Sequence, residues 1–147
     1  MKNFLKKQRF IILTLIFAII ILAVIFAVFS IDKKTNIMIT DYIKAAGWQI
    51  NENPVEISRI TIPNEFDSVY DAYNKIQKAD GFNLENYKGL NVCRYTYSVL
   101  NHKYSGEDKV LVNVFVYKNE IIAADISSNG KNSFIYELNN TSEMLTQ

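Results

Sequence analysis

Residues 110–127 read VLVNVFVYKNEIIAADIS, and this stretch encodes two β-strands and the turn between them. From Val110 to Tyr117, valine occupies every second position, which is the two-residue period of a strand. Lys118-Asn119 forms the two-residue connection of a tight hairpin, and Glu120–Ser127 returns as the second strand. The stretch therefore predicts an antiparallel hairpin.

The sequence on either side of this hairpin extends the sheet. Upstream, residues 91–99 alternate in the same way, and a polar loop separates them from the hairpin. Residues 54–62 are rich in β-branched side chains and predict an earlier strand. Downstream, Asn129-Gly130 indicates another turn, after which residues 134–138 can form a short strand or a helix. This order predicts an antiparallel meander.

Two helices are predicted ahead of the meander. Residues 39–46 carry apolar side chains at helical spacing, and Gly47 stands where a glycine commonly ends a helix. The second helix begins at Asn64 as N-cap and ends at Gly81. Its apolar side chains form one stripe, typical of a core-facing surface: Phe66, Val69, Tyr70, Tyr73 and Ile76. The predicted fold class is α+β, an antiparallel β-sheet meander with two helices packed on one face.

The N-terminal part of the chain has the composition of a membrane anchor. Residues 10–31 contain no charged side chain, and only Thr14 and Ser30 are polar. About 20 such residues cross a hydrocarbon core about 30 Å thick as a helix. A buried helix of a soluble protein rarely has this length without a polar face. We therefore expect one transmembrane helix at residues 10–31, in contact with membrane lipid.

The charges beside this segment predict its direction. Residues 1–9 contain four basic side chains and no acidic one, whereas Lys33 and Lys34 are the only basic residues just after the segment. The positive-inside rule makes residues 1–9 a cytoplasmic basic tail and places the C-terminal part outside the cell membrane. The apolar stretch is longer than that of a signal peptide. We expect an uncleaved signal anchor; secretion after cleavage near Ser30 is the alternative.

The remainder divides into three parts. Residues 32–36 are predicted to be a short polar linker, and residues 37–138 an extracytoplasmic α+β domain. Residues 139–147 are predicted to be a flexible tail. A domain of this length buries enough surface to fold by itself.

Composition excludes several classes of function. From Asp32 onward the acidic side chains outnumber the basic ones by three, so the clustered Lys and Arg needed to bind nucleic acid are missing. Cys93 is the only cysteine and His102 the only histidine, which leaves too few ligands for a zinc site. The sequence contains no glycine-rich phosphate loop and no calcium-loop spacing. We expect no metal site and no cofactor.

Few residues are candidates for a functional site. Asp125 is an acid in an otherwise apolar strand, and Arg94 is its natural counterpart; a structural ion pair or exposure to solvent is the alternative for both. Together with Trp48 they are the candidate binding residues. No catalytic residue is predicted. A carboxylate pair of Asp125 with Asp67 or Asp71 would be the basis of a hydrolase.

Several short segments resemble one bacterial family of unknown function. They are YIKAAGW at 42–48, ITIPNEF at 60–66, YDAYN at 70–74, GF at 81–82, YKG at 87–89 and RYTYSVLN at 94–101. The family is a domain-of-unknown-function family of exported or membrane-anchored proteins from spore-forming Gram-positive bacteria, and the resemblance covers residues 36–138. It implies an extracytoplasmic location and no assigned activity, so it implies no site residues. At the level of fold, the chain also resembles PepSY-type domains, which occur beside extracytoplasmic peptidases.

These observations lead to one expected function and two alternatives. We expect a membrane-anchored extracytoplasmic domain that is not an enzyme and that binds a protein, a peptide or a cell-wall component through a sheet face or an edge strand. One alternative is a secreted or tethered hydrolase that uses a carboxylate pair. The other is a PepSY-like modulator of an extracytoplasmic peptidase.

Overall fold

The computed structural model describes the backbone of residues 2–142 and 144, and the side chains of residues 13–22, 33–142 and 144. The chain divides into two compact units, residues 1–37 and residues 38–147. Helix α1, Lys2–Ala45, runs through the first unit and contributes its last turns to the second. Residues 32–36, expected as a linker, lie within this helix.

The predicted membrane anchor is also part of α1. Among the residues that the structure describes, no helix is both long enough and apolar enough to cross a membrane. Residues 10–12 and 23–31 of the predicted anchor lie outside the described side chains.

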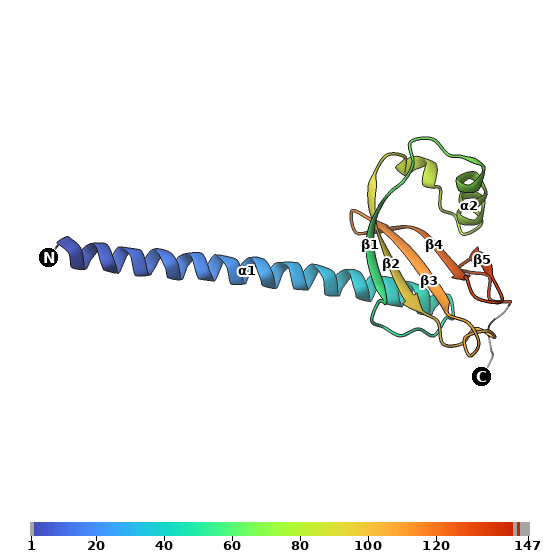
Figure 1. Ribbon diagram of the computed structural model, residues 1–147, viewed down its shortest axis with the longest axis horizontal. Helices are drawn as coiled ribbons and strands as arrows, with labels where there is room; N and C mark the ends of the chain where they lie inside the picture. Colours follow the sequence, from blue (N-terminus) through green and yellow to red (C-terminus); the bar gives the residue numbers. More distant parts are fainter. Residues whose placement is uncertain (1, 143, 145–147) are drawn as a thin grey trace. The chain divides into compact units, whose positions relative to one another are not determined.

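The second unit is built on an antiparallel sheet that has five strands in the described part of the chain, in the order β1-β2-β3-β4-β5 (Figure 1). The strands are β1 Glu56–Thr61, β2 Asn91–Ser98, β3 Val110–Tyr117, β4 Glu120–Ser128 and β5 Phe134–Glu137. Each strand pairs with the next in sequence, so the predicted meander and the α+β class are confirmed. The tight turn between β3 and β4 is also present, with positive φ at Lys118 and Asn119.

One face of the sheet, here called the α1 face, packs against the end of helix α1. The register places Tyr95, Val114 and Ala124 side by side on this face. They share one hydrophobic core with Ile39 and Ile43 of α1, both of which are fully buried. The apolar spacing of residues 39–46 therefore does face the core.

The opposite face, here called the α2 face, packs against helix α2, Ser68–Ala79, and the segment that follows it. Phe115 and Ala123 are paired on this face and belong to a second core, which Tyr73 of α2 adjoins. The prediction that both helices pack on one face is therefore wrong. The central strands carry apolar side chains at both parities, and a sheet that is apolar on both sides must be covered on both sides.

Helix α2 is shorter than predicted at its beginning. Asp67, not Asn64, is the N-cap, and its carboxylate accepts a hydrogen bond from the Tyr70 amide at 2.8 Å. The helix ends as expected, with Gly81 in the left-handed region at φ +85°. A short 3₁₀ helix, η1, Leu84–Tyr87, leads into β2.

Trp48 joins the end of α1 to the end of β5. Gly47 adopts φ +92° and turns the chain, which places the Trp48 ring inside the core of the α1 face. The Trp48 Nε1 donates a hydrogen bond of 2.7 Å to the carbonyl of Leu138, the residue after β5. One side chain thus satisfies a backbone group and fills the core at the same point.

Part of the predicted flexible tail contacts the domain. Asn139 donates two hydrogen bonds to the Asp80 carboxylate, at 3.2 and 2.9 Å. Met144 forms a backbone bridge with His102 and packs against the core of the α1 face. Residues 143 and 145–147 lie outside the described part of the chain.

We expect Trp48→Phe to destabilise the fold by about 1–3 kcal/mol, because the buried Leu138 carbonyl loses its hydrogen-bond donor. Urea denaturation of the full chain, followed by near-ultraviolet circular dichroism of its tyrosines, measures the change. Leu100→Ala is the control, since Leu100 is exposed and its truncation should change stability by less than about 0.5 kcal/mol. Equal stability of Trp48→Phe and the wild type would contradict the role of this hydrogen bond.

Candidate functional site

A row of polar side chains crosses the α2 face of the sheet from one edge to the other. The register pairs Glu56 with Thr96, and Thr96 with Asn113. It then pairs Asn113 with Asp125, and Asp125 with Glu137. Each strand contributes one residue. The candidate residue Asp125 is therefore one member of a continuous polar row, not an isolated acid.

Asp125 is 2% exposed, and hydrogen bonds from neighbouring side chains satisfy its carboxylate. Its Oδ2 accepts a hydrogen bond from the Tyr73 hydroxyl at 2.7 Å, and its Oδ1 accepts one from Asn113 Nδ2 at 2.9 Å. Asn113 Oδ1 accepts in turn from the Thr96 hydroxyl at 2.9 Å. Burial raises the pKa of Asp125, and the hydrogen bonds lower it only in part. Burial, together with the nearby Asp125, also raises the pKa of Tyr73 well above its ordinary value.

Arg94 lies on the same face of the sheet, and its hydrogen-bonded partner is Glu56. The Arg94 Nη2 donates to Glu56 Oε1 at 2.9 Å, which links β1 to β2. The positive charge of Arg94 also acts on Asp125, where it favours the ionised form. The predicted relation between Arg94 and Asp125 is thus electrostatic, while Glu56 accepts the hydrogen bond.

The other residues singled out from the sequence lie elsewhere. Trp48 is buried on the α1 face, where it binds the backbone after β5. Asp67 caps helix α2, and Asp71 is exposed in the first turn of that helix. The structure therefore brings together Arg94 and Asp125 but separates Trp48 from them by the thickness of the sheet.

Helix α2 contacts the sheet through polar side chains. Its buried residues are Asn74 and Gln77. Gln77 Oε1 accepts a hydrogen bond from the Ala124 amide at 2.9 Å, and Asn74 Oδ1 accepts one from the Leu84 amide at 2.8 Å. The bonds from Tyr73 to Asp125 and from Ala124 to Gln77 hold α2 over β4, and the bond from Leu84 to Asn74 joins α2 to η1.

The apolar stripe predicted to face the core is divided between two surroundings. Phe66, Tyr70 and Tyr73 pack against the core of the α2 face. Val69, by contrast, is 73% exposed. It lines an apolar groove of about 400 Å³ that has Ile135 of β5 as its opposite wall. The groove, here called the α2–β5 groove, is lined by Ser68, Val69, Ala72, Tyr73, Ile76 and Ile135.

The chemistry of this arrangement favours binding. A general acid or base must come within about 3 Å of the proton that it transfers. Asp125 is buried and both of its oxygens accept internal hydrogen bonds, so in this conformation it is not presented to a substrate. In the part of the chain that the structure describes, no group of three His, Cys, Asp or Glu side chains could hold a metal ion. The accessible surface beside the polar row is the apolar groove.

Sequence reasoning found Asp125 and Arg94 but missed Asn113 and Thr96. The turn at Lys118-Asn119, read as a regular hairpin, would pair Asn113 with Ala124. The register instead shifts between Phe115 and Val116, and this irregularity places Asn113 opposite Asp125. An extra residue in β4 thus completes the polar row across the sheet. The alternation of apolar and polar residues in the sequence does not indicate this register shift.

Comparison with known proteins identifies the family. A family model described as "Domain of unknown function (DUF4830)" matches residues 42–126. The match begins in the last turn of α1 and ends in β4, and thus includes α2 and the polar row as far as Asp125. It confirms the resemblance to a family of unknown function. No curated protein and no solved structure shows significant similarity to the chain.

We expect Asp125→Asn to change how stability depends on pH. Asp125 ionises at a higher pH in the folded chain than its ordinary pKa of 3.8, so its ionisation destabilises the fold as pH rises through the raised pKa. The amide cannot ionise. The free energy of unfolding of the variant, minus that of the wild type, should therefore increase as pH rises from the ordinary pKa of 3.8 to the raised pKa of Asp125. Urea denaturation between about pH 3 and 8 measures the difference.

Asp108→Asn is the control with the opposite sign. The Asp108 carboxylate accepts hydrogen bonds from the Asn132 and Lys131 amides, and the Asn132 bond is the main reason that its pKa is lowered. Its stabilisation is present above the unfolded pKa and is lost as pH falls, so this variant should lose stability relative to the wild type as pH rises. The same pH trend in both variants would contradict the raised pKa of Asp125.

Proposed function

The chain belongs to the DUF4830 family, a domain of unknown function, and we propose that it is a non-catalytic binding protein tethered to the outer surface of a bacterial cell membrane. Its ligand is an extended apolar segment of another protein. The binding site is the α2–β5 groove. The single observation that carries the proposal is the exposed apolar wall of that groove, which α2 presents while its polar side chains hold it to the sheet.

The groove has the composition of a peptide-binding surface. Val69 and Ile135 are both exposed, and Ala72 and Ile76 lie between them on the groove wall. Exposed apolar surface that is grouped in one concave place commonly marks an interaction site. Because α2 is held by hydrogen bonds to Asp125 and Ala124, a ligand can cover its apolar side without displacing the helix.

The edge strand β5 favours a ligand in extended conformation. Strand β5 pairs with β4 on one side, and in the described residues no strand pairs with its other side. A segment added along β5 would continue the sheet and place alternate side chains on its two faces. On the α2 face they would meet Ile135 and the groove. On the α1 face they would meet Phe134 and Tyr136, whose rings stack with centroids 4.9 Å apart.

The location outside a membrane rests on the N-terminal segment. Residues 10–31 have no charge, and four basic residues precede them. Between residues 13 and 22 every described side chain is exposed, and all except Thr14 are apolar. An exposed apolar surface of this extent is unfavourable in water and suits contact with lipid.

Peptide selection tests the groove directly. Peptides selected from a random phage-displayed library on the full chain in lipid nanodiscs should carry apolar residues at alternate positions. We expect their Kd, measured by fluorescence anisotropy, to rise at least tenfold for Val69→Asp and Ile135→Asp. This corresponds to about 1.4 kcal/mol or more, because a bound ligand would remove water from the new carboxylate.

The matched control is Ile57→Asp. Ile57 is 57% exposed on β1, the strand at the other edge of the sheet, whereas Ile135 is 42% exposed on β5. We expect the Ile57 variant to keep the wild-type Kd. Equal losses at both edges, or no loss in either groove variant, would count against the α2–β5 groove as the site.

Labelling with a membrane-impermeant maleimide tests the predicted orientation. In a Cys93→Ala background, which removes the only cysteine, Asn53→Cys should be labelled in intact bacterial cells. Asn3→Cys should be labelled only after permeabilisation, because it lies on the cytoplasmic side of the segment. The same pattern with a chain of full mass in the membrane fraction supports an uncleaved anchor. Protection of Asn53→Cys in intact cells would contradict the orientation.

A further inference from the structure

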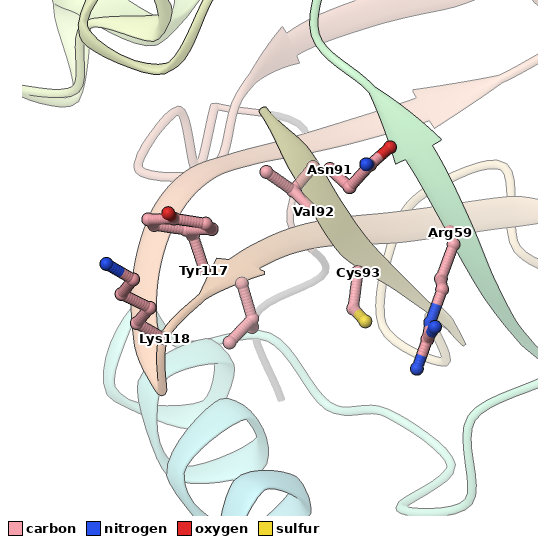
Figure 2. A pocket seen from close by; sticks show the side chains of 7 residues that line it. Arg59, Asn91, Val92, Cys93, Tyr117 and Lys118 are labelled. Atoms are coloured by element: carbon pink, nitrogen blue, oxygen red, sulfur yellow. The ribbon is translucent and has the colours of Figure 1, made fainter. Parts of the chain in front are cut away.

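A second cavity, of about 290 Å³, lies beside β1, β2 and the end of β3 (Figure 2). The register pairs Arg59 with Cys93 and Cys93 with Val116, so these side chains form a row on the α1 face. Lys118, in the turn after β3, contributes another part of the wall. Figure 2 shows Cys93 between Arg59 and Lys118. The thiol of the chain's only cysteine thus lines the cavity between these two cationic residues, and the Lys118 ammonium is directed away from it, over the Tyr117 ring (Figure 2).

The charge of this cavity is opposite to that of the chain around it. Two of its seven lining residues, Arg59 and Lys118, are cationic and none is acidic. From Asp32 onward, however, the chain has three more acidic than basic side chains. Among the described residues, the ion pairs that form on the surface include neither of these two cations. The cavity therefore concentrates positive charge that has no carboxylate on its walls.

A neutral donor adds to this charge. Thr61 donates a hydrogen bond of 2.7 Å to Asn91 Oδ1, so the amide oxygen is engaged on the side of β1. Asn91 lines the cavity, and the N–H groups of its Nδ2 are the neutral donors that it contributes there. The apolar part of the wall comes from Val116 and from the Tyr117 ring, over which the Lys118 ammonium lies at 5.2 Å. The lining thus combines cations, an amide donor and an apolar surface.

We propose that this cavity binds a small organic oxyanion, a carboxylate or a phosphate monoester, with the anionic group held by Arg59 and Lys118. The planar guanidinium of Arg59 suits two oxygens of either group, and the flexible side chain of Lys118 turns from the Tyr117 ring to add a point charge. Asn91 donates to a remaining oxygen, while the organic part contacts Val116 and Tyr117. This site lies at one end of β1, β2 and β3 and shares no lining residue with the α2–β5 groove, so it does not depend on that groove.

Cys93 provides a direct measure of occupancy. The rate at which N-ethylmaleimide alkylates Cys93 is measured on the full chain with and without hexanoate, hexyl phosphate or the neutral hexanamide. We expect an anion to slow alkylation at least threefold at saturation, because its alkyl group covers the thiol, and hexanamide to have no such effect. Protection by hexanoate alone assigns a carboxylate ligand, and protection by hexyl phosphate alone assigns a phosphate ligand.

Charge variants show where the anion binds. Arg59→Gln and Lys118→Gln should each abolish protection, whereas Arg59→Lys, which keeps the charge, should retain part of it. Lys109→Gln removes an exposed charge that does not line the cavity. In this variant the anion should protect Cys93 as well as it does in the wild type. The alkylation rate without ligand and the circular dichroism spectrum report whether each variant is folded. No protection by either anion, equal protection by hexanamide, or full protection in Arg59→Gln would overturn the proposal.

Discussion

The hydrogen bond from the Tyr73 hydroxyl to Asp125 is the contact on which the rest of this domain's surface depends. A carboxylate in the core is very unfavourable unless donors replace the water that it has lost. Tyr73 and Asn113 supply those donors, one from helix α2 and one from β3. The position of α2 is therefore set by the direction and length of the hydrogen bond from Tyr73 to Asp125. Its apolar side chains are not all needed to hold it, and Val69 can remain outside the core.

The same hydrogen-bond network distinguishes between the structural role and the catalytic role that the sequence suggested for Asp125. Both of its oxygens are engaged, so it holds the helix and does not present a base to a substrate. What it positions is an apolar groove beside an edge strand, a surface suited to an extended segment of protein. At one end of β1, β2 and β3, Arg59 and Lys118 border a separate cavity, which we propose binds a small anion. The two proposed sites differ in chemistry and in position: helix α2 and β5 line the groove, whereas β1, β2, the end of β3 and the turn after it line the cavity.

Local features of the sequence predicted local structure well. Gly47 and Gly81 end their helices, and Lys118-Asn119 makes the hairpin turn, because each depends on backbone conformations that neighbouring residues decide. The assignment of faces was less successful. Periodicity shows which side chains of α2 share a side, but it does not show whether that side meets the sheet. Asn74 and Gln77 lie outside the predicted apolar stripe, and they are the buried residues of the helix.

By itself, the sequence determined the order of the strands and the antiparallel meander, because these depend on short-range alternation of apolar and polar residues. It also determined the family, and it singled out Asp125 and Arg94 as the charged residues of greatest interest. Tertiary structure decided that the helices lie on opposite faces, since both parities of the central strands are apolar and each face needs a cover. It also decided that Asn113 meets Asp125. A regular hairpin from the same turn would pair Asn113 with Ala124, and the irregularity opposite Phe115 and Val116 moves the register by one residue. Such a shift is a property of two paired strands, and neither strand's own sequence encodes it.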